Sequence, residues 1–116
     1  MRHRKKGKIL DRKKAPRTAL LRGLATSIII YEKIKTTKAK AKTVKPMVEK
    51  LITIAKVNNL TNRRKLTKVL YHKNAVKKAL EVLGPRYQDR KGGYLRIINL
   101  GKRLGDGADI VQIEFV

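Results

Sequence analysis

The stretch TTKAKAKTVKPMVEKLITIA, residues 36–55, carries the clearest helical pattern in the chain. Its apolar side chains recur every three or four positions and therefore share one face of a helix, with lysines on the other side. The apolar face consists of Ala41, Val44, Met47, Val48, Leu51, Ile52 and Ala55. Thr36 or Thr37 is placed to cap this helix. Pro46 predicts a kink or a late helix start, because it removes a backbone donor and crowds the preceding turn.

Upstream of this stretch, a further helix is expected to begin near Pro16, which suits a first turn because its missing N–H has no partner there. Its apolar positions follow the helical period and are Leu20, Leu21, Leu24, Ala25, Ile28 and Ile29. The branched run at 28–30 weakens the helix end and favours extended chain. Residues 32–36 are therefore predicted to form a short strand.

Downstream, two shorter helices are predicted. Thr61 or Asn62 is positioned to cap the first, and Asn74 to cap the second. Their inward positions are Leu66, Val69, Leu70, Val76, Ala79, Leu80 and Leu83. Gly84 and Pro85 predict an abrupt stop, because glycine suits a left-handed cap and proline forbids continuation of the helix.

The last quarter of the chain changes to a strand period. Residues 94–100 are predicted to form a strand, 101–109 a glycine-rich loop, and 110–116 a second strand with clean alternation. The two strands are expected to pair as a hairpin. The sum is an α+β protein of α-β-α(3)-β(2) order with a small mixed sheet. We expect one domain over 16–116, preceded by an extended basic tail over 1–15.

Charge is the dominant feature of the composition. Thirty-one Lys and Arg stand against eight Asp and Glu among 116 residues, for a formal net charge of +23. Such an excess indicates a polyanionic partner, because a free chain would repel itself. The basic tail is the densest part, and closely spaced cations on extended chain can follow a line of phosphates.

Several classes of function find no support. The chain has no cysteine, which excludes disulfides and thiolate metal sites and fits a reducing cytoplasm. No apolar run approaches the ~20 residues of a membrane span. The two histidines, His3 and His72, and the single serine, Ser27, form no catalytic pattern, and carboxylates among so many cations should stay ionised. We expect neither an enzyme nor a bound metal or cofactor.

Several short motifs follow one another in a fixed order. They are MRHRKKGK at 1–8, IKTT at 34–37, LIT at 51–53, NRR at 62–64, LGPRY at 83–87, GGYLRI at 92–97 and GD at 105–106. In this order they closely resemble the family of bacterial ribosomal protein seventeen of the large subunit, over the whole length of the chain.

The resemblance implies a structural component of the large ribosomal subunit, working in the cytoplasm within the ribosome and binding the large ribosomal RNA. It also implies the α-β-α(3)-β(2) order that periodicity indicates independently. Members of the family lie near the peptide exit tunnel, beside other ribosomal proteins. Self-association and membrane binding are not expected.

The predicted RNA-binding residues fall into groups. By resemblance, the basic tail contributes Arg2, His3, Arg4, Lys5, Lys6, Lys8 and Arg12. Further cations and one hydroxyl group follow along the chain, at helix starts and in basic or glycine-containing turns, where backbone and side-chain donors can meet phosphate. They are Lys13, Arg17, Arg22, Lys35, Thr36, Lys38, Lys40, Arg63, Arg64, Arg86, Arg90, Lys91, Lys102 and Arg103.

Each group also has a plainer interpretation. The tail is otherwise a solvated charge run or a localisation signal, and the helix starts are ordinary caps with exposed basic faces. Tyr87 and Tyr94 either stack on bases or lie in the core. At the level of the whole chain, the alternatives are a nucleoid-type DNA-binding protein, although no helix has a polar base-reading face, and a binder of anionic membranes, although tryptophan is absent.

Overall fold

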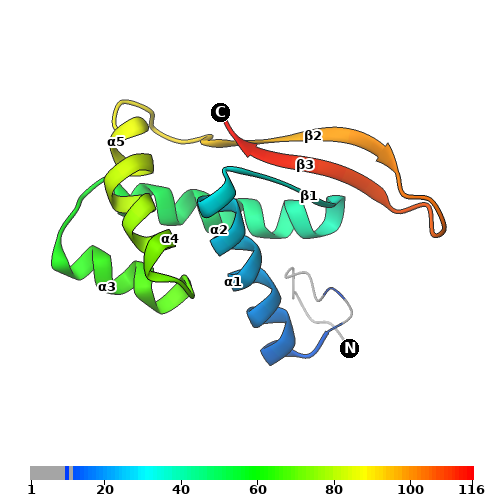
Figure 1. The fold of residues 1–116 in the computed structure, drawn as a ribbon, viewed down its shortest axis with the longest axis horizontal. Coiled ribbons are helices and arrows are strands. Elements are labelled where there is room, and N and C mark those ends of the chain that lie inside the picture. The colour runs from blue at the N-terminus through cyan, green and yellow to red at the C-terminus, as the bar shows by residue number, and fades with distance from the viewer. Residues whose placement is uncertain (1–9, 11) are drawn as a thin grey trace, which may run out of the picture.

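The computed structural model describes residue 10 and residues 12–116. Helices precede and follow a first short strand, and a β-hairpin ends the chain (Figure 1). The elements are α1 (Lys14–Tyr31), β1 (Lys33–Thr37), α2 (Lys38–Ala55), α3 (Leu60–Val69), α4 (Lys73–Lys78), the π-helical turn η1 (Ala79–Leu83), α5 (Gly84–Arg86), β2 (Leu95–Lys102) and β3 (Asp109–Phe115). Because α4, η1 and α5 follow without a break, the predicted α-β-α(3)-β(2) order and the α+β class are confirmed.

The sheet has the strand order β1-β3-β2, and both pairings are antiparallel. The expectation of a mixed sheet is therefore wrong. The predicted hairpin is confirmed, since a short connection can join β2 to β3 only in antiparallel fashion. Strand β1 runs in the same direction as β2 but pairs with the other edge of β3, so the two parallel strands never meet.

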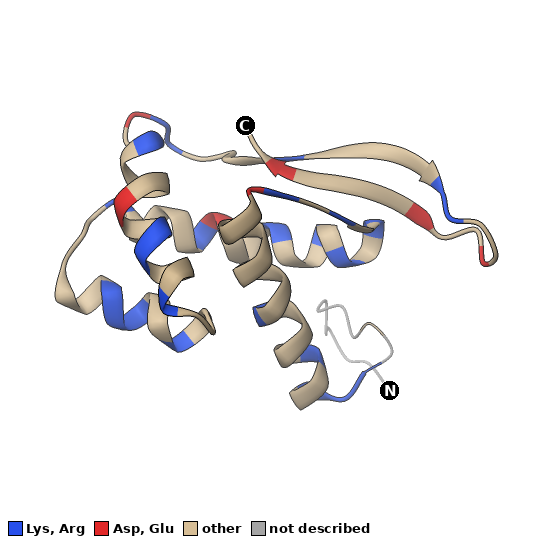
Figure 2. Ribbon diagram, in the orientation of Figure 1, with Lys and Arg blue, Asp and Glu red and all other residues tan. Residues whose placement is uncertain are grey.

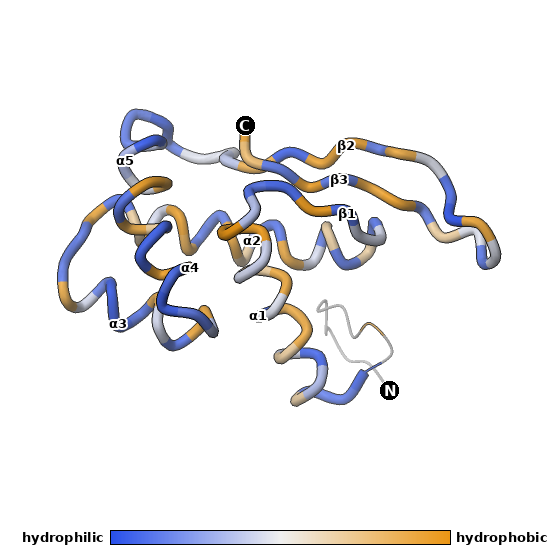
Figure 3. The backbone as a smooth tube through the Cα atoms, in the orientation of Figure 1, coloured by the Kyte–Doolittle hydropathy of each residue, from blue (hydrophilic) through white to orange (hydrophobic). Residues whose placement is uncertain are grey.

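Helix α2 forms the centre of the core. Its predicted apolar face is buried at every position except Met47, which is partly buried. The helix begins at Lys38, so the expected late start is wrong. Pro46 and Lys42, the residue whose carbonyl loses its helical partner, are both exposed, so water can replace the missing donor. Figure 3 shows mostly hydrophilic residues along α3, and hydrophobic residues interrupted by hydrophilic ones along β2 and β3.

Helix α1 begins at Lys14, and Pro16 lies in its first turn as predicted. The inward positions Ala25, Ile28 and Ile29 are fully buried. The helix ends at Tyr31, and the next residue, Glu32, adopts a left-handed conformation with φ of 66° and turns the chain directly into β1. This turn brings the Glu32 side chain close to the later helices.

The predicted caps differ from the observed ones. Helix α3 is capped by Asn59, whose side-chain oxygen accepts from the Asn62 N–H at 2.8 Å. Asn62 instead uses its own side-chain amide to donate to the carbonyls of Ile54 (3.1 Å) and Val57 (2.9 Å), which closes the end of α2. This asparagine therefore joins two helices, a role that helix propensity alone does not indicate.

At the starts of α2 and α4, the residue before the helix makes no side-chain capping hydrogen bond. Thr37 precedes α2, and His72 rather than Asn74 precedes α4. Thr37 therefore occupies the N-cap position as predicted but makes no capping hydrogen bond, whereas the predicted capping by Asn74 is wrong, because Asn74 lies inside α4. Thr36 lies in β1 opposite Val111.

The predicted stop at Gly84 is wrong. Gly84 has right-handed helical angles, and its N–H donates to the carbonyl of Ala79, five residues back. This wider turn admits Pro85 without breaking the helix. A Cβ at Gly84 would overlap the Ala55 carbonyl oxygen, and it would lie 2.9 Å from the Ala55 carbonyl carbon. The glycine therefore serves a close approach of two helices and not a left-handed cap.

Three aromatic rings join the end of this helix to the sheet. The Tyr87 ring centroid lies 5.3 Å from that of Tyr94 and 5.9 Å from that of Phe115. The Tyr87 hydroxyl donates to the Val116 carbonyl at 2.8 Å. Both tyrosines are buried, so they belong to the core and are not available for base stacking. Among the described residues, no helix combines the length and the apolar character needed to cross a membrane.

Candidate nucleic-acid interface

Basic side chains are spread over most of the described surface. Figure 2 shows Lys and Arg on α1, α2, α3, α4 and β1, and at both ends of the hairpin, with few acidic residues between them. Within the described residues, ion pairs involve only Lys78, Arg86, Arg96 and Arg103. Most of the positive charge therefore remains without an internal counter-charge.

One basic group lies where β1 leads into α2. Lys35 is exposed on the edge strand, and Lys38 and Lys40 are partly exposed at the helix start. Lys38 also lines a shallow hollow of about 370 Å³ with Lys42 and Asp109. Of the predicted cations, only Lys38 thus lines the hollow, beside Lys42 and one carboxylate.

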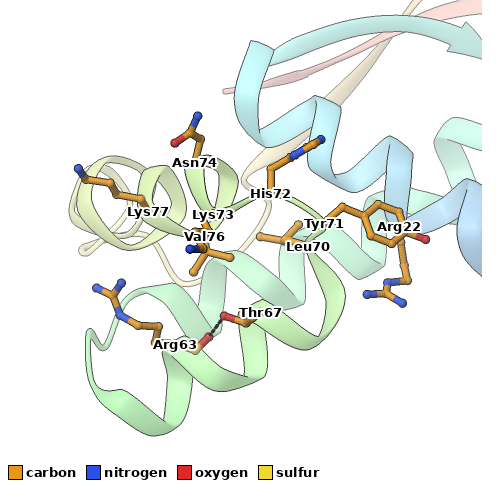
Figure 4. Close-up of a pocket in the computed structure, with 10 residues that line it drawn as sticks. All are labelled: Arg22, Arg63, Thr67, Leu70, Tyr71, His72, Lys73, Asn74, Val76 and Lys77. Atoms are coloured by element: carbon orange, nitrogen blue, oxygen red, sulfur yellow. Dashed lines mark hydrogen bonds between the residues drawn. The ribbon is translucent and has the colours of Figure 1, made fainter.

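Arg63 and Arg64 are both exposed in the first turns of α3, which contain no acidic residue. Cations at this end oppose the helix dipole, and a bound anion would offset that cost. Arg63 lines a larger cavity that is bordered by α4 (Figure 4). The predicted pair of arginines is therefore accessible.

Arg22 is only partly exposed, because it serves an internal contact. Its Nε donates to the carbonyl of Val69 at 2.9 Å, and its guanidinium carbon lies 4.5 Å from the centroid of the Tyr71 ring. These contacts connect α1 to the end of α3. They still leave part of the guanidinium at the rim of the cavity.

Arg86 forms an ion pair with Glu32. The Lys78 Nζ lies 3.0 Å from the other oxygen of the same carboxylate. Lys78 donates in addition to the carbonyl of Ile30 at 2.8 Å. Hydrogen bonds from Arg86 and Lys78 lower the pKa of Glu32 to about 2. The structure thus gives Arg86 a role in stability, since it holds the helix end against the turn into β1.

This ion pair predicts a pH dependence of stability. The pKa of Glu32 is lower in the folded protein (about 2) than its ordinary 4.5, so its contribution is complete above pH 4.5 and is lost as pH falls toward 2. We expect Glu32→Gln to lower the free energy of unfolding by about 1 kcal/mol at pH 7, a value reduced for partial exposure. Urea unfolding at pH 7, 4 and 2.5 should show this difference shrinking with acidity. Glu81→Gln, an exposed control, should show no such trend, and a pH-independent deficit in Glu32→Gln would contradict the assignment.

The two basic loops also contain internal contacts. The Arg90 Nε donates to the Gly92 carbonyl at 3.1 Å, whereas Lys91 is exposed. The Arg103 Nε donates to an Asp106 oxygen at 3.0 Å, and this arginine is the main cause that lowers the pKa of Asp106 to about 2. Lys102 is exposed beside this pair. Lys91 and Lys102 are thus freer to bind an anion than Arg90 and Arg103.

The remaining predicted residues lie near the start of the chain. Arg12 and Lys13 are exposed and Arg17 is partly exposed, and the Arg12 Nη1 donates to the Leu10 carbonyl at 2.7 Å. The predictions for Arg2, His3, Arg4, Lys5, Lys6 and Lys8 lie outside the described residues.

Sequence reasoning missed three members of the cavity beside Arg63. Tyr71, Lys73 and Lys77 line it together with the predicted Arg22 (Figure 4). No local motif marks them, because the cavity forms only where α1, α3 and α4 come together. The one available signal in the sequence was a tyrosine with lysines two and six positions after it.

Comparison with known proteins identifies the family of the chain. A family model described as ribosomal protein L17 matches residues 20–116. The curated relatives of the chain are named large ribosomal subunit protein bL17. The protein of Rickettsia bellii is 47% identical over 116 residues, covering 100% of this chain and 82% of its own. That of Solibacter usitatus is 50% identical, with 100% and 77% covered. That of Thermomicrobium roseum is 46% identical, with 100% and 99% covered. The chain therefore belongs to the ribosomal protein L17 family.

Proposed function

We propose that the chain is a structural constituent of the large ribosomal subunit that binds large-subunit ribosomal RNA and supports subunit assembly. Its relatives are named as proteins of that subunit. It is a structural component and not an enzyme, and it works in the cytoplasm within the ribosome. The family resemblance supports neighbours among other ribosomal proteins near the peptide exit tunnel.

The excess of uncompensated positive charge carries this proposal. Only four cations form ion pairs among the described residues, whereas the whole chain has a formal net charge of +23. Phosphate contacts supply most of the affinity of such a surface, and the folded shape of RNA supplies specificity. Most apolar positions of the described helices are buried in one core, which does not favour a membrane-binding face.

The salt dependence of RNA binding tests the proposal. With about 10 phosphate contacts, the logarithm of the binding constant for a large-subunit RNA transcript should fall with the logarithm of salt at a slope of roughly −7 to −9. Filter binding from 50 to 300 mM KCl measures the slope, with unrelated structured RNA and heparin as competitors. The transcript should outcompete both at equal phosphate concentration. Equal competition, together with absence of the protein from large subunits on sucrose gradients, would disprove the proposal.

A further inference from the structure

A cavity of about 600 Å³ lies between α1, α3 and α4, at the connection formed by residues 70–72 (Figure 4). This volume falls in the usual range of small-ligand sites. Its apolar floor includes Leu70 and Val76, which are 3% and 5% exposed. The cavity is therefore large enough for one nucleotide and has an apolar surface on which a base can rest.

The walls of the cavity are strongly basic. Four cations line it, namely Arg22, Arg63, Lys73 and Lys77, and no Asp or Glu does. None of the four forms an ion pair with a described acidic residue. Such a surface attracts an anionic ligand, and cations spread along the cavity from three helices suit the successive phosphates of a nucleic-acid backbone better than a single carboxylate (Figure 4).

One wall presents a flat π-surface. Tyr71 is 50% exposed, and the Arg22 guanidinium lies over its ring with 4.5 Å between the guanidinium carbon and the ring centroid. Both residues are held in place, since the Tyr71 N–H donates to the Thr26 hydroxyl at 3.3 Å and the Arg22 Nε donates to the Val69 carbonyl at 2.9 Å. Unpaired bases stack on such aromatic rings and guanidinium planes.

We propose that this cavity binds a single unpaired nucleotide of RNA. The base stacks on the wall formed by Tyr71 and Arg22 at one end of the cavity, and the adjoining RNA backbone runs toward Arg63, Lys73 and Lys77, which line the rest of the cavity (Figure 4). A paired base cannot enter, because its faces are covered within the helix, so the cavity selects a bulged or looped nucleotide. The inference rests on the proposed function, and it adds a discrete recognition site to a surface that is otherwise diffusely basic.

Titration of the full chain with adenosine 5′-monophosphate tests the site. Two-dimensional NMR would follow the resonances of His72 and Thr67, which also line the cavity. Ribose 5-phosphate is the matched probe, since it carries the same phosphate without a base. We expect the nucleotide to shift these resonances with an affinity on the order of tenfold higher than that of ribose 5-phosphate. Tyr71→Ala should abolish this preference, Tyr71→Phe should keep it, and Lys50→Ala, a distant exposed control, should not change it.

Equal affinities for the two probes, or no shift at the cavity, would overturn the inference. Binding of the large-subunit RNA transcript by the same preparation separates this failure from that of the proposed function. Retained transcript binding without a nucleotide preference would refute the cavity site alone. Loss of transcript binding as well would refute both.

Discussion

Replacing Gly84 with alanine is expected to lower the free energy of unfolding by roughly 3 kcal/mol. The new Cβ would overlap the Ala55 carbonyl oxygen, lie 2.9 Å from the Ala55 carbonyl carbon and lie 3.2 Å from the Ala79 carbonyl oxygen. All three neighbours are backbone atoms, which cannot rotate away as a side chain can. The end of α2 and the start of α5 must therefore separate, which disturbs the core on both sides. Urea unfolding followed by circular dichroism measures the change.

Gly23→Ala is the matched control. Gly23 lies inside α1, and a Cβ at that position would meet nothing within 4 Å. The same substitution should there raise stability by roughly 0.5–1 kcal/mol, because alanine is the better helix former. If alanine lowers the free energy of unfolding at Gly84 but raises it at Gly23, then packing and not helix propensity decides the effect at Gly84. A stability for Gly84→Ala equal to or above that of the parent chain would contradict the close helix approach.

The contrast between Gly84 and the long helix shows which features a sequence reveals. The apolar face of α2 and the alternation of Val111, Ile113 and Phe115 in β3 report burial directly, and these predictions are confirmed. Gly84 and Pro85 form an ordinary stop signal in local terms. The close contact with Ala55 and the wider π-helical turn override that signal, and neither is visible from neighbouring residues.

The basic side chains show a similar limit. Their positions are evident from the sequence, but the partners of several are distant along the chain. Arg86 meets Glu32 across 54 positions, and Arg22 meets the carbonyl of Val69 across 47. Composition therefore predicts a polyanion-binding surface, while only the fold tells which arginines are occupied by internal contacts. The cavity beside Tyr71 depends on three helices and was not predictable for the same reason.

Deleting residues 1–12 is expected to weaken binding to a large-subunit RNA transcript by about three orders of magnitude at 100 mM salt. The deletion removes six cations, Arg2, Arg4, Lys5, Lys6, Lys8 and Arg12, and one acid, Asp11. If each cation contacts one phosphate, the salt slope should become less negative by roughly 4 to 5. The truncated chain keeps Lys13 and the whole of α1, so its circular dichroism and thermal unfolding should match those of the full chain. Incorporation into large subunits should fall in parallel with RNA affinity.

Two matched variants separate the contribution of this segment from that of charge in general. Replacing the exposed body lysines Lys50, Lys65 and Lys68 with glutamine should change the salt slope much less, because none of them is among the predicted contacts. A full-length chain with the order of residues 2–12 permuted keeps every charge. If the segment follows a defined path on RNA, the permuted chain should bind the transcript but enter subunits poorly. Normal incorporation of the truncated chain would instead show that the folded body alone carries the interaction.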